Sequence, residues 1–146
     1  MTAPSVRLGD DVRPGDALPP VIRTPSEVSL FLFSGVTWNP HRIHYDAPYA
    51  ASEGYEAPLV QGHMHGALLV RCVMDWMGPQ GLLETFGYQN RRYAIAGDTL
   101  TARGTVGAVM ADADGFHVEI DLVETNQRDE ECVRGHARVR LPRRGG

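Results

Sequence analysis

The amino-acid sequence predicts an α+β fold in which an antiparallel sheet wraps around one long, mostly apolar helix. The helix is indicated by the proline-free stretch from Gly62 to Gly78, which is apolar on most sides, and the sheet by a C-terminal half in which apolar and polar residues alternate. A helix of this kind needs cover on most of its surface, and a curved sheet provides it. The 146 residues, 42% of them hydrophobic, suffice for one core and predict a single domain over residues 1–146.

The N-terminal segment, residues 1–20, is rich in Asp, Pro and Gly and is expected to be an extended lead-in. Pro19 and Pro20 disfavour a helix at its end, so a short strand is expected over residues 21–23. The lead-in lacks the apolar stretch of a secretory signal, which predicts a cytoplasmic location. No apolar run approaches the roughly 20 residues that span a bilayer, so no membrane association is expected.

The first helix is expected from Pro25 to about Gly35. Thr24 provides a hydroxyl for the N-cap, Pro25 suits the first helical position, and Glu27 is a carboxylate three residues after the cap. The helix is expected to be substantially buried, because its apolar residues are nearly continuous. These residues are Val28, Leu30, Phe31, Leu32 and Phe33.

Two more helices and four strands follow. A short helix over residues 47–53 is expected to end at Gly54, and the long helix begins at Gly62 with its stop at Gly78. The strands are expected over residues 88–95, 100–110, 116–123 and 133–141. Turn residues separate the last three, which predicts an antiparallel meander, and a turn at Gly97-Asp98 is expected to join the strand 88–95 to the next. Residues 142–146 are expected to be a frayed tail.

Charge and cysteine usage narrow the possible partners. The 14 basic residues are all arginine and face 18 acidic ones, for a net charge of -4, which argues against a nucleic-acid partner. An anionic ligand would be bound by guanidinium groups, since the chain has no lysine. Cys72 and Cys132 show no metal-ligand or redox spacing and are interpreted as reduced core thiols.

The chemically informative stretch is the loop from Trp38 to Asp46, which contains two histidines, an arginine, a tyrosine and a carboxylate. A histidine beside a buried helix end can exchange protons near neutral pH, so His44 or His41 is the candidate base. The alternative is that these polar groups only cap helices and satisfy buried backbone.

The four imidazoles of His41, His44, His63 and His65 suit zinc or a similar ion by ligand type. His63 and His65 are two residues apart and point in different directions on a helix, and no carboxylate or thiol has a recognised ligand spacing with them. We therefore expect no metal.

Gly62 is the second candidate site because it begins the long helix. The unpaired amides at a helix start can stabilise a developing oxyanion. The alternative is that Gly62 only allows a tight turn into the helix.

Residues of both sites resemble a known family. Asn39-Pro40 followed by His44-Tyr45-Asp46 resembles the Asn-Pro-x-His-x-Asp signature of the MaoC-like (R)-specific enoyl-CoA hydratases and acyl dehydratases. The resemblance continues through residues 53–55, 59–62 and 96–100 and covers most of the chain from about Ser34.

The resemblance implies a hot-dog fold, a dimer, and reversible hydration of a 2-enoyl thioester or dehydration of a 3-hydroxyacyl thioester. It implies that His44 is the acid or base and that the amide near Gly62 binds the thioester oxygen. Asn39 is expected to hold water or to cap the loop, and Asp46 to orient an imidazole or to anchor the loop. Substrate contacts are assigned to Arg42, Tyr45, Gln61, His63, Arg91 and Arg92, of which the arginines either bind the phosphates of the carrier or are ordinary solvated charges. No cofactor is implied, since coenzyme A or acyl carrier protein is part of the substrate.

Three departures from the family pattern leave alternatives open. Thr37 occupies a position where many members have aspartate, His41 and Arg42 are extra residues before the aligned histidine, and Gln61 stands where relatives often have histidine. The incomplete Asp–His pair keeps a second reading, a subunit that needs another hot-dog chain as partner. A thioesterase is a weaker rival, because Gln61 provides no carboxylate at the helix start.

Overall fold

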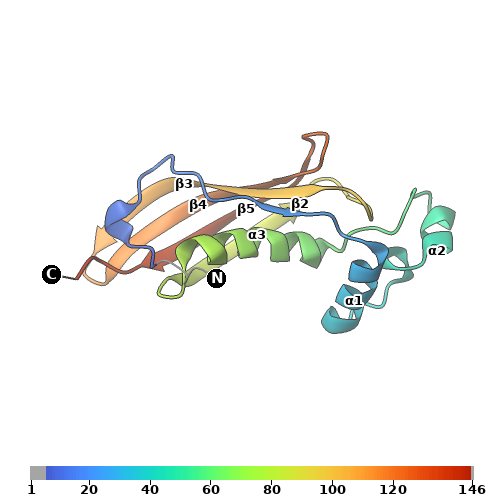
Figure 1. Cartoon of the computed structure of the whole chain (residues 1–146), viewed down its shortest axis with the longest axis horizontal. Coiled ribbons are helices and arrows are strands. Elements are labelled where there is room, and N and C mark those ends of the chain that lie inside the picture. Colours follow the sequence, from blue (N-terminus) through green and yellow to red (C-terminus); the bar gives the residue numbers. More distant parts are fainter. Residues whose placement is uncertain (1–5, 146) are drawn as a thin grey trace.

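The computed structural model describes residues 6–145, and in it five antiparallel strands form one sheet in the order β1-β3-β4-β5-β2. The strands are β1 Val21–Arg23, β2 Leu82–Asn90, β3 Leu100–Asp112, β4 Gly115–Thr125 and β5 Glu131–Leu141. The helices are α1 Glu27–Thr37, α2 Ala47–Ser52 and α3 Gly62–Met77, with 3₁₀ turns η1 Gly9–Asp11 and η2 Arg42–His44. Figure 1 shows α3 lying along one face of the sheet, with α1 and α2 beyond the end where α3 begins.

The core lies between α3 and the sheet. On α3, Leu69, Cys72 and Val73 are fully buried. From the sheet, alternate residues of β4 and β5, such as Ile120 and Ala137, are buried against the same cluster. The period-two pattern of these strands and the long apolar helix are therefore both confirmed.

Glycines allow α3 to approach the sheet closely. A Cβ atom on Gly66 of α3 would lie 2.5 Å from the ring of Tyr88 on β2. On the sheet side, a Cβ on Gly135 would lie 3.2 Å from a methyl group of Leu69. Larger residues at either position would push the helix away from the strands.

The start of α1 differs from the expectation. Ser26, not Thr24, is the N-cap, and its hydroxyl accepts a hydrogen bond from the Ser29 amide at 3.2 Å. Thr24 lies before the helix and its hydroxyl is 3.0 Å from that of Thr99. The cap moves because Pro25 is not the first helical residue, which is Glu27.

The expected burial of α1 is wrong for this chain on its own. Only Leu30 and Ser34 of α1 are buried, whereas Phe31, Leu32 and Val36 are 58%, 59% and 86% exposed. A nearly continuous apolar run places apolar side chains on every side of a helix, but α1 projects beyond the sheet (Figure 1) and packs along a single line.

The strand expected over residues 88–95 differs in both bounds and neighbour. The structure has β2 at Leu82–Asn90, and it pairs with β5 at the edge of the sheet and not with β3, so the expected tight turn from this strand into β3 is wrong. Buried and exposed residues do not alternate regularly in the first half of β2, so the period-two pattern of a strand is absent there. Residues 91–95 form a connection in which Ile95 bridges Leu59.

Both terminal segments are more ordered than expected. The lead-in contains η1 and contributes buried Val12 and Leu18 to the core. The tail is not frayed over residues 142–145, because the Pro142 carbonyl accepts a hydrogen bond from Gly9 at 3.0 Å and the Arg144 guanidinium is 2.6 Å from Asp11. Residues 1–5 and 146 lie outside the described part of the chain.

Candidate active site at the start of α3

The histidine loop begins where α1 ends and leads into α2. Trp38, the C-cap of α1, has φ 52°, which turns the chain out of the helix. Asp46 is the N-cap of α2 and accepts a hydrogen bond from the Tyr49 amide at 3.0 Å. It also accepts from Arg42 at 2.9 Å, and this guanidinium, followed by the Tyr49 amide, holds the pKa of Asp46 below its usual range. These bonds support the anchoring role for Asp46.

His44 is half-buried and attached to the segment before α3. Its Nδ1 lies 2.9 Å from the Leu59 carbonyl oxygen, so Nδ1 donates its proton there and the neutral ring has an unshared electron pair on Nε2. The Ile43 carbonyl accepts from the Leu59 amide at 2.9 Å, which fixes the loop to the same segment. Burial lowers the pKa of His44, against the opposing effect of the Leu59 carbonyl. The imidazole is therefore neutral and able to act as a base at neutral pH.

His41 lies close to His44 but has a different environment. It is exposed, and its Nδ1 accepts a hydrogen bond from the Ile43 amide at 3.2 Å as the N-cap of η2. The ring centroids of His41 and His44 are 6.1 Å apart. The capping alternative thus describes His41 well, whereas Nε2 of His44 is left available to accept a proton.

The remaining candidates of the loop make contacts within it. The Asn39 amide closes α1 on the Ser34 carbonyl at 2.9 Å. The Tyr45 hydroxyl donates to the Pro40 carbonyl at 2.9 Å. The Arg42 guanidinium, besides binding Asp46, lies over the ring of Tyr49 at 4.7 Å. None of these contacts excludes a role with substrate, but each one also stabilises the loop.

The start of α3 provides free amide groups. The Met64 and His65 amides both donate to the Gln61 carbonyl, at 2.9 and 3.3 Å. The amides of Gly62 and His63 have no acceptor among residues 6–145. A Cβ on Gly62 would lie 2.8 Å from Nδ2 of Asn90, so this position has no room for a side chain unless Asn90 moves.

A cavity of about 260 Å³ adjoins this helix start. It is lined by Val60, Gly62, His65, Asn90, Arg91, Arg92 and Tyr93. Two predicted substrate contacts, Arg91 and Arg92, are therefore placed beside Gly62, although Arg92 also lies 3.5 Å from Glu130. The exposed His63 is on the first turn of α3 and does not line this cavity.

Gln61, another predicted substrate contact, is fully buried. Its Nε2 donates to the Leu30 carbonyl at 2.7 Å and to the Ser34 hydroxyl at 2.9 Å. The structure thus gives Gln61 a structural role, joining α1 to the start of α3, in place of the expected contact with substrate.

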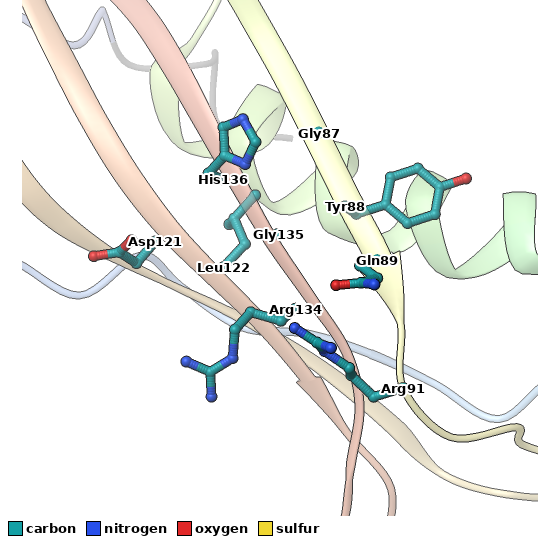
Figure 2. Close-up of a pocket in the computed structure, with 9 residues that line it drawn as sticks. All are labelled: Gly87, Tyr88, Gln89, Arg91, Asp121, Leu122, Arg134, Gly135 and His136. Carbon is teal, nitrogen blue, oxygen red and sulfur yellow. The ribbon is translucent and has the colours of Figure 1, made fainter.

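A larger hollow of about 730 Å³ lies on the other face of the sheet and is open to solvent. Figure 2 shows Arg134 and His136 there, on β5, with Asp121 and Arg91 around them. Arg134 and His136 alternate along β5 with the buried residues Val133 and Ala137. The hollow contains neither His44 nor Gly62, and it shares only Arg91 with the cavity beside Gly62.

Sequence reasoning missed the pairing of His65 with Glu124. His65 is 2% exposed, Glu124 is fully buried, and His65 Nδ1 is hydrogen-bonded to Glu124 Oε1. The signal was present, because Glu124 continues the set of alternate β4 residues that face α3, two positions after buried Leu122. A carboxylate in that phase of a strand needs a partner.

The structure bears on three further expectations. Cys72 and Cys132 are free and buried, and burial raises the pKa of each thiol to about 11, as expected for unreactive core cysteines. Within residues 6–145, no three His, Cys, Asp or Glu side chains come together as metal ligands would. The helices described there are all too short or too polar to cross a membrane.

Comparison with known proteins identifies relatives by sequence. Residues 14–96, more than half of the chain, match the family model described as hydroxyacyl-thioester dehydratase type 2. The chain is 48% identical over 105 residues to mesaconyl-C(4)-CoA hydratase of Chloroflexus aurantiacus, covering 67% of this chain and 38% of the relative. It is 28% identical over 79 residues to the mitochondrial hydroxyacyl-thioester dehydratase type 2 of Saccharomyces cerevisiae, covering 53% of this chain and 28% of the relative. The chain therefore spans well under half the length of either curated relative.

Solved structures show the same fold. The unliganded R-hydratase PhaJ1 from Pseudomonas aeruginosa superposes with a TM-score of 0.85 at 22% identity, over 94% of this chain and 86% of that one. A chain of the ChsH1–ChsH2 complex from Mycobacterium tuberculosis gives a TM-score of 0.78 at 22% identity, over 88% and 98% of the two chains. The expected hot-dog fold is thereby confirmed.

Proposed function

The chain belongs to the hydroxyacyl-thioester dehydratase type 2 family, and from that premise we propose that it adds water reversibly across the double bond of a 2-enoyl thioester. The reverse reaction is the dehydration of a 3-hydroxyacyl thioester. The observation that carries the proposal is the attachment of His44 to the start of α3, where its Nδ1 is held by Leu59 three residues before Gly62. This bond ties the loop that carries a neutral imidazole to the segment that leads into the two free amide groups.

In the proposed hydration, His44 Nε2 takes a proton from water as the water oxygen bonds to C3 of the substrate. The electron pair of the C2–C3 double bond moves onto the thioester oxygen, where the Gly62 amide stabilises the negative charge. The imidazolium of His44 then returns a proton to C2. This sequence uses one proton shuttle and one oxyanion site, and it requires no metal or redox cofactor.

The carrier part of the substrate is assigned to the arginines. Arg91 and Arg92 lie on the cavity beside Gly62, and Arg42 is on the loop. Guanidinium groups bind phosphates through paired hydrogen bonds, which suits coenzyme A or the phosphopantetheine of an acyl carrier protein.

The test compares the two histidines of the loop. Loss of conjugated-thioester absorbance is followed for a panel of 2-enoyl-CoA substrates with wild type, His44→Ala and His41→Ala. His44→Ala is expected to lower kcat by about 10²–10⁴-fold, the usual contribution of a positioned acid–base group. His41→Ala is the matched control, since its Nδ1 already accepts from the Ile43 amide, and an equal loss in His41→Ala would move the base to that residue. Release of free thiol instead of hydration would indicate the thioesterase.

The rate of hydration should fall at acidic pH, when His44 becomes protonated. Because burial lowers the pKa of His44, the neutral base persists below the ordinary histidine value of about 6.5. Hydration should therefore stay constant from pH 7 down to about 6.5 and fall only at more acidic pH.

A second candidate, a subunit that depends on a partner chain, is favoured by two observations. The Thr37 hydroxyl, at the position where many relatives have aspartate, donates to the Phe33 carbonyl at 2.6 Å within α1. The exposed apolar side chains of α1, such as Phe31 and Val36, are also typical of a surface that another chain covers. Two measurements separate an active homodimer from a partner-dependent subunit. Light scattering gives the oligomeric state of the purified chain, and turnover is measured before and after a second hot-dog chain is added.

A further inference from the structure

The proposed reaction needs hydrogen-bond donors at the thioester oxygen, and a second one is present in the cavity beside Gly62. His65 lines this cavity, and its Nδ1 is used by Glu124. Its Nε2 is hydrogen-bonded to none of residues 6–145. His65 is only 2% exposed as a residue, and it thus has one ring nitrogen left for a ligand in the cavity.

The buried pair itself indicates which form the ring adopts. Glu124 is fully buried, its Oε2 has no hydrogen-bond partner among the described residues, and its Oε1 is bonded to His65. Burying a net charge costs far more than burying a neutral pair. A net-neutral pair is either carboxylate with imidazolium or carboxylic acid with neutral imidazole. In both of these forms Nδ1 is shared with Glu124 and Nε2 carries a hydrogen.

We propose that His65 is a second oxyanion donor, whose Nε2–H donates a hydrogen bond to the thioester oxygen beside that of the Gly62 amide. Glu124 is the positioning residue that keeps a hydrogen on Nε2. The proposal rests on the hydratase function proposed above and adds no proton transfer to it. His44 remains the shuttle, and His65 stabilises the electron pair that arrives on the thioester oxygen.

This arrangement also bears on the departures from the family pattern. Gln61 is committed to α1 and cannot assist the thioester. His65 provides a polar donor one helical turn further into α3, on the same cavity. The chain thereby has a side-chain donor at the start of the helix despite the residue at position 61.

The enzymatic test replaces the whole pair, because removing one member alone leaves an unpaired buried group and risks unfolding. The double variant His65→Met/Glu124→Leu provides an apolar pair of similar volume. We expect it to fold, to lower kcat by about 10²–10³-fold, as loss of an oxyanion donor does, and to change KM little. Turnover within about threefold of wild type would overturn the proposal, since a purely structural pair is replaceable by an apolar one.

A second histidine–glutamate pair provides the matched control. His117 Nδ1 lies 2.8 Å from Glu84, and His117 is on the outer side of the sheet and lines no described cavity. The variant His117→Met/Glu84→Leu removes the same two residue types and should leave kcat within about twofold. An equal loss in this control would assign the effect to stability instead of to the oxyanion site.

A measurement that needs no turnover separates this inference from the proposed function. In ¹⁵N-labelled protein, the His65 ring should show a hydrogen on Nε2, and its resonance should shift when butyryl-CoA, a saturated thioester, is added. A bare Nε2, or a resonance unmoved by saturating butyryl-CoA, would overturn the proposal even in an active hydratase. An inactive wild type with a shifted Nε2–H resonance would instead contradict the hydration reaction and retain His65 as a thioester contact.

Discussion

The body formed by α3 and the sheet and the projecting segment from α1 to α2 are both rich in apolar residues, but the body buries far more of them. Leu69 and Val73 of α3 are fully buried, whereas Phe31 and Leu32 of α1 are more than half exposed. The sheet covers α3 over its length, while α1 is held mainly along the line of Leu30 and Ser34. Apolar content therefore predicts burial only where a second layer exists to receive it.

The largest effect should come from the body. Leu69→Ala removes a fully buried side chain from the middle of α3 and is expected to lower the free energy of unfolding by about 2–5 kcal/mol. The matched change in the projecting segment, Leu32→Ala, should cost less than about 0.5 kcal/mol, as is usual for surface positions. Urea unfolding followed by circular dichroism measures both. A loss of several kcal/mol for Leu32→Ala would show that α1 is covered in the assembled protein and would remove the contrast.

A smaller effect should identify which residue starts α1. Ser26→Ala removes the hydroxyl that accepts from the Ser29 amide and should cost about 1 kcal/mol, a typical N-cap contribution. Thr24→Ala, which removes an exposed hydroxyl outside the helix, is the control and should change the free energy of unfolding little. The reverse order would restore Thr24 as the cap.

The smallest effect concerns the outer face of the sheet. Hydrogen bonds to Glu84 and then to Asp112 raise the pKa of His117 above its usual value. The stabilisation from this cluster is thus fully present below the unfolded-state value of about 6.5 and is lost as the pH rises through the higher folded-state value. NMR titration of the ring should show a lower pKa in Glu84→Gln, and an unchanged midpoint would mean that Glu84 does not contribute.

The sequence was a good guide to the body and a poorer one to the projecting segment. The bounds of α3, the start of the strand at Leu100 and the turn at Gly54 follow from local patterns, and the structure agrees with them, although β3 extends past the expected end at Met110 to Asp112. The exposure of α1 could not be read from its sequence, because burial depends on where a helix lies relative to the sheet. The cap at Ser26 was missed because two hydroxyl residues, Thr24 and Ser26, flank Pro25 and the local signal favours either.

The candidate site was predictable only where local sequence patterns mark its residues. His44 and Gly62 were singled out from sequence, and the structure brings their segments together through Leu59. The partnership of His65 with Glu124 joins residues 59 positions apart and depends on the sheet register, which no local pattern specifies. A buried carboxylate in an alternating strand was its only visible sign.

The bond from Gln61 to α1 has a consequence for control of activity. Gln61 immediately precedes Gly62 and its side chain holds the Leu30 carbonyl, so α1 cannot shift without displacing the residue that sets the direction of the Gly62 amide. Anything that covers the exposed side of α1 would thus act on the amide group proposed above as the oxyanion site. If a second chain covers α1, its binding and substrate binding are thermodynamically linked, and each should tighten the other by the same factor.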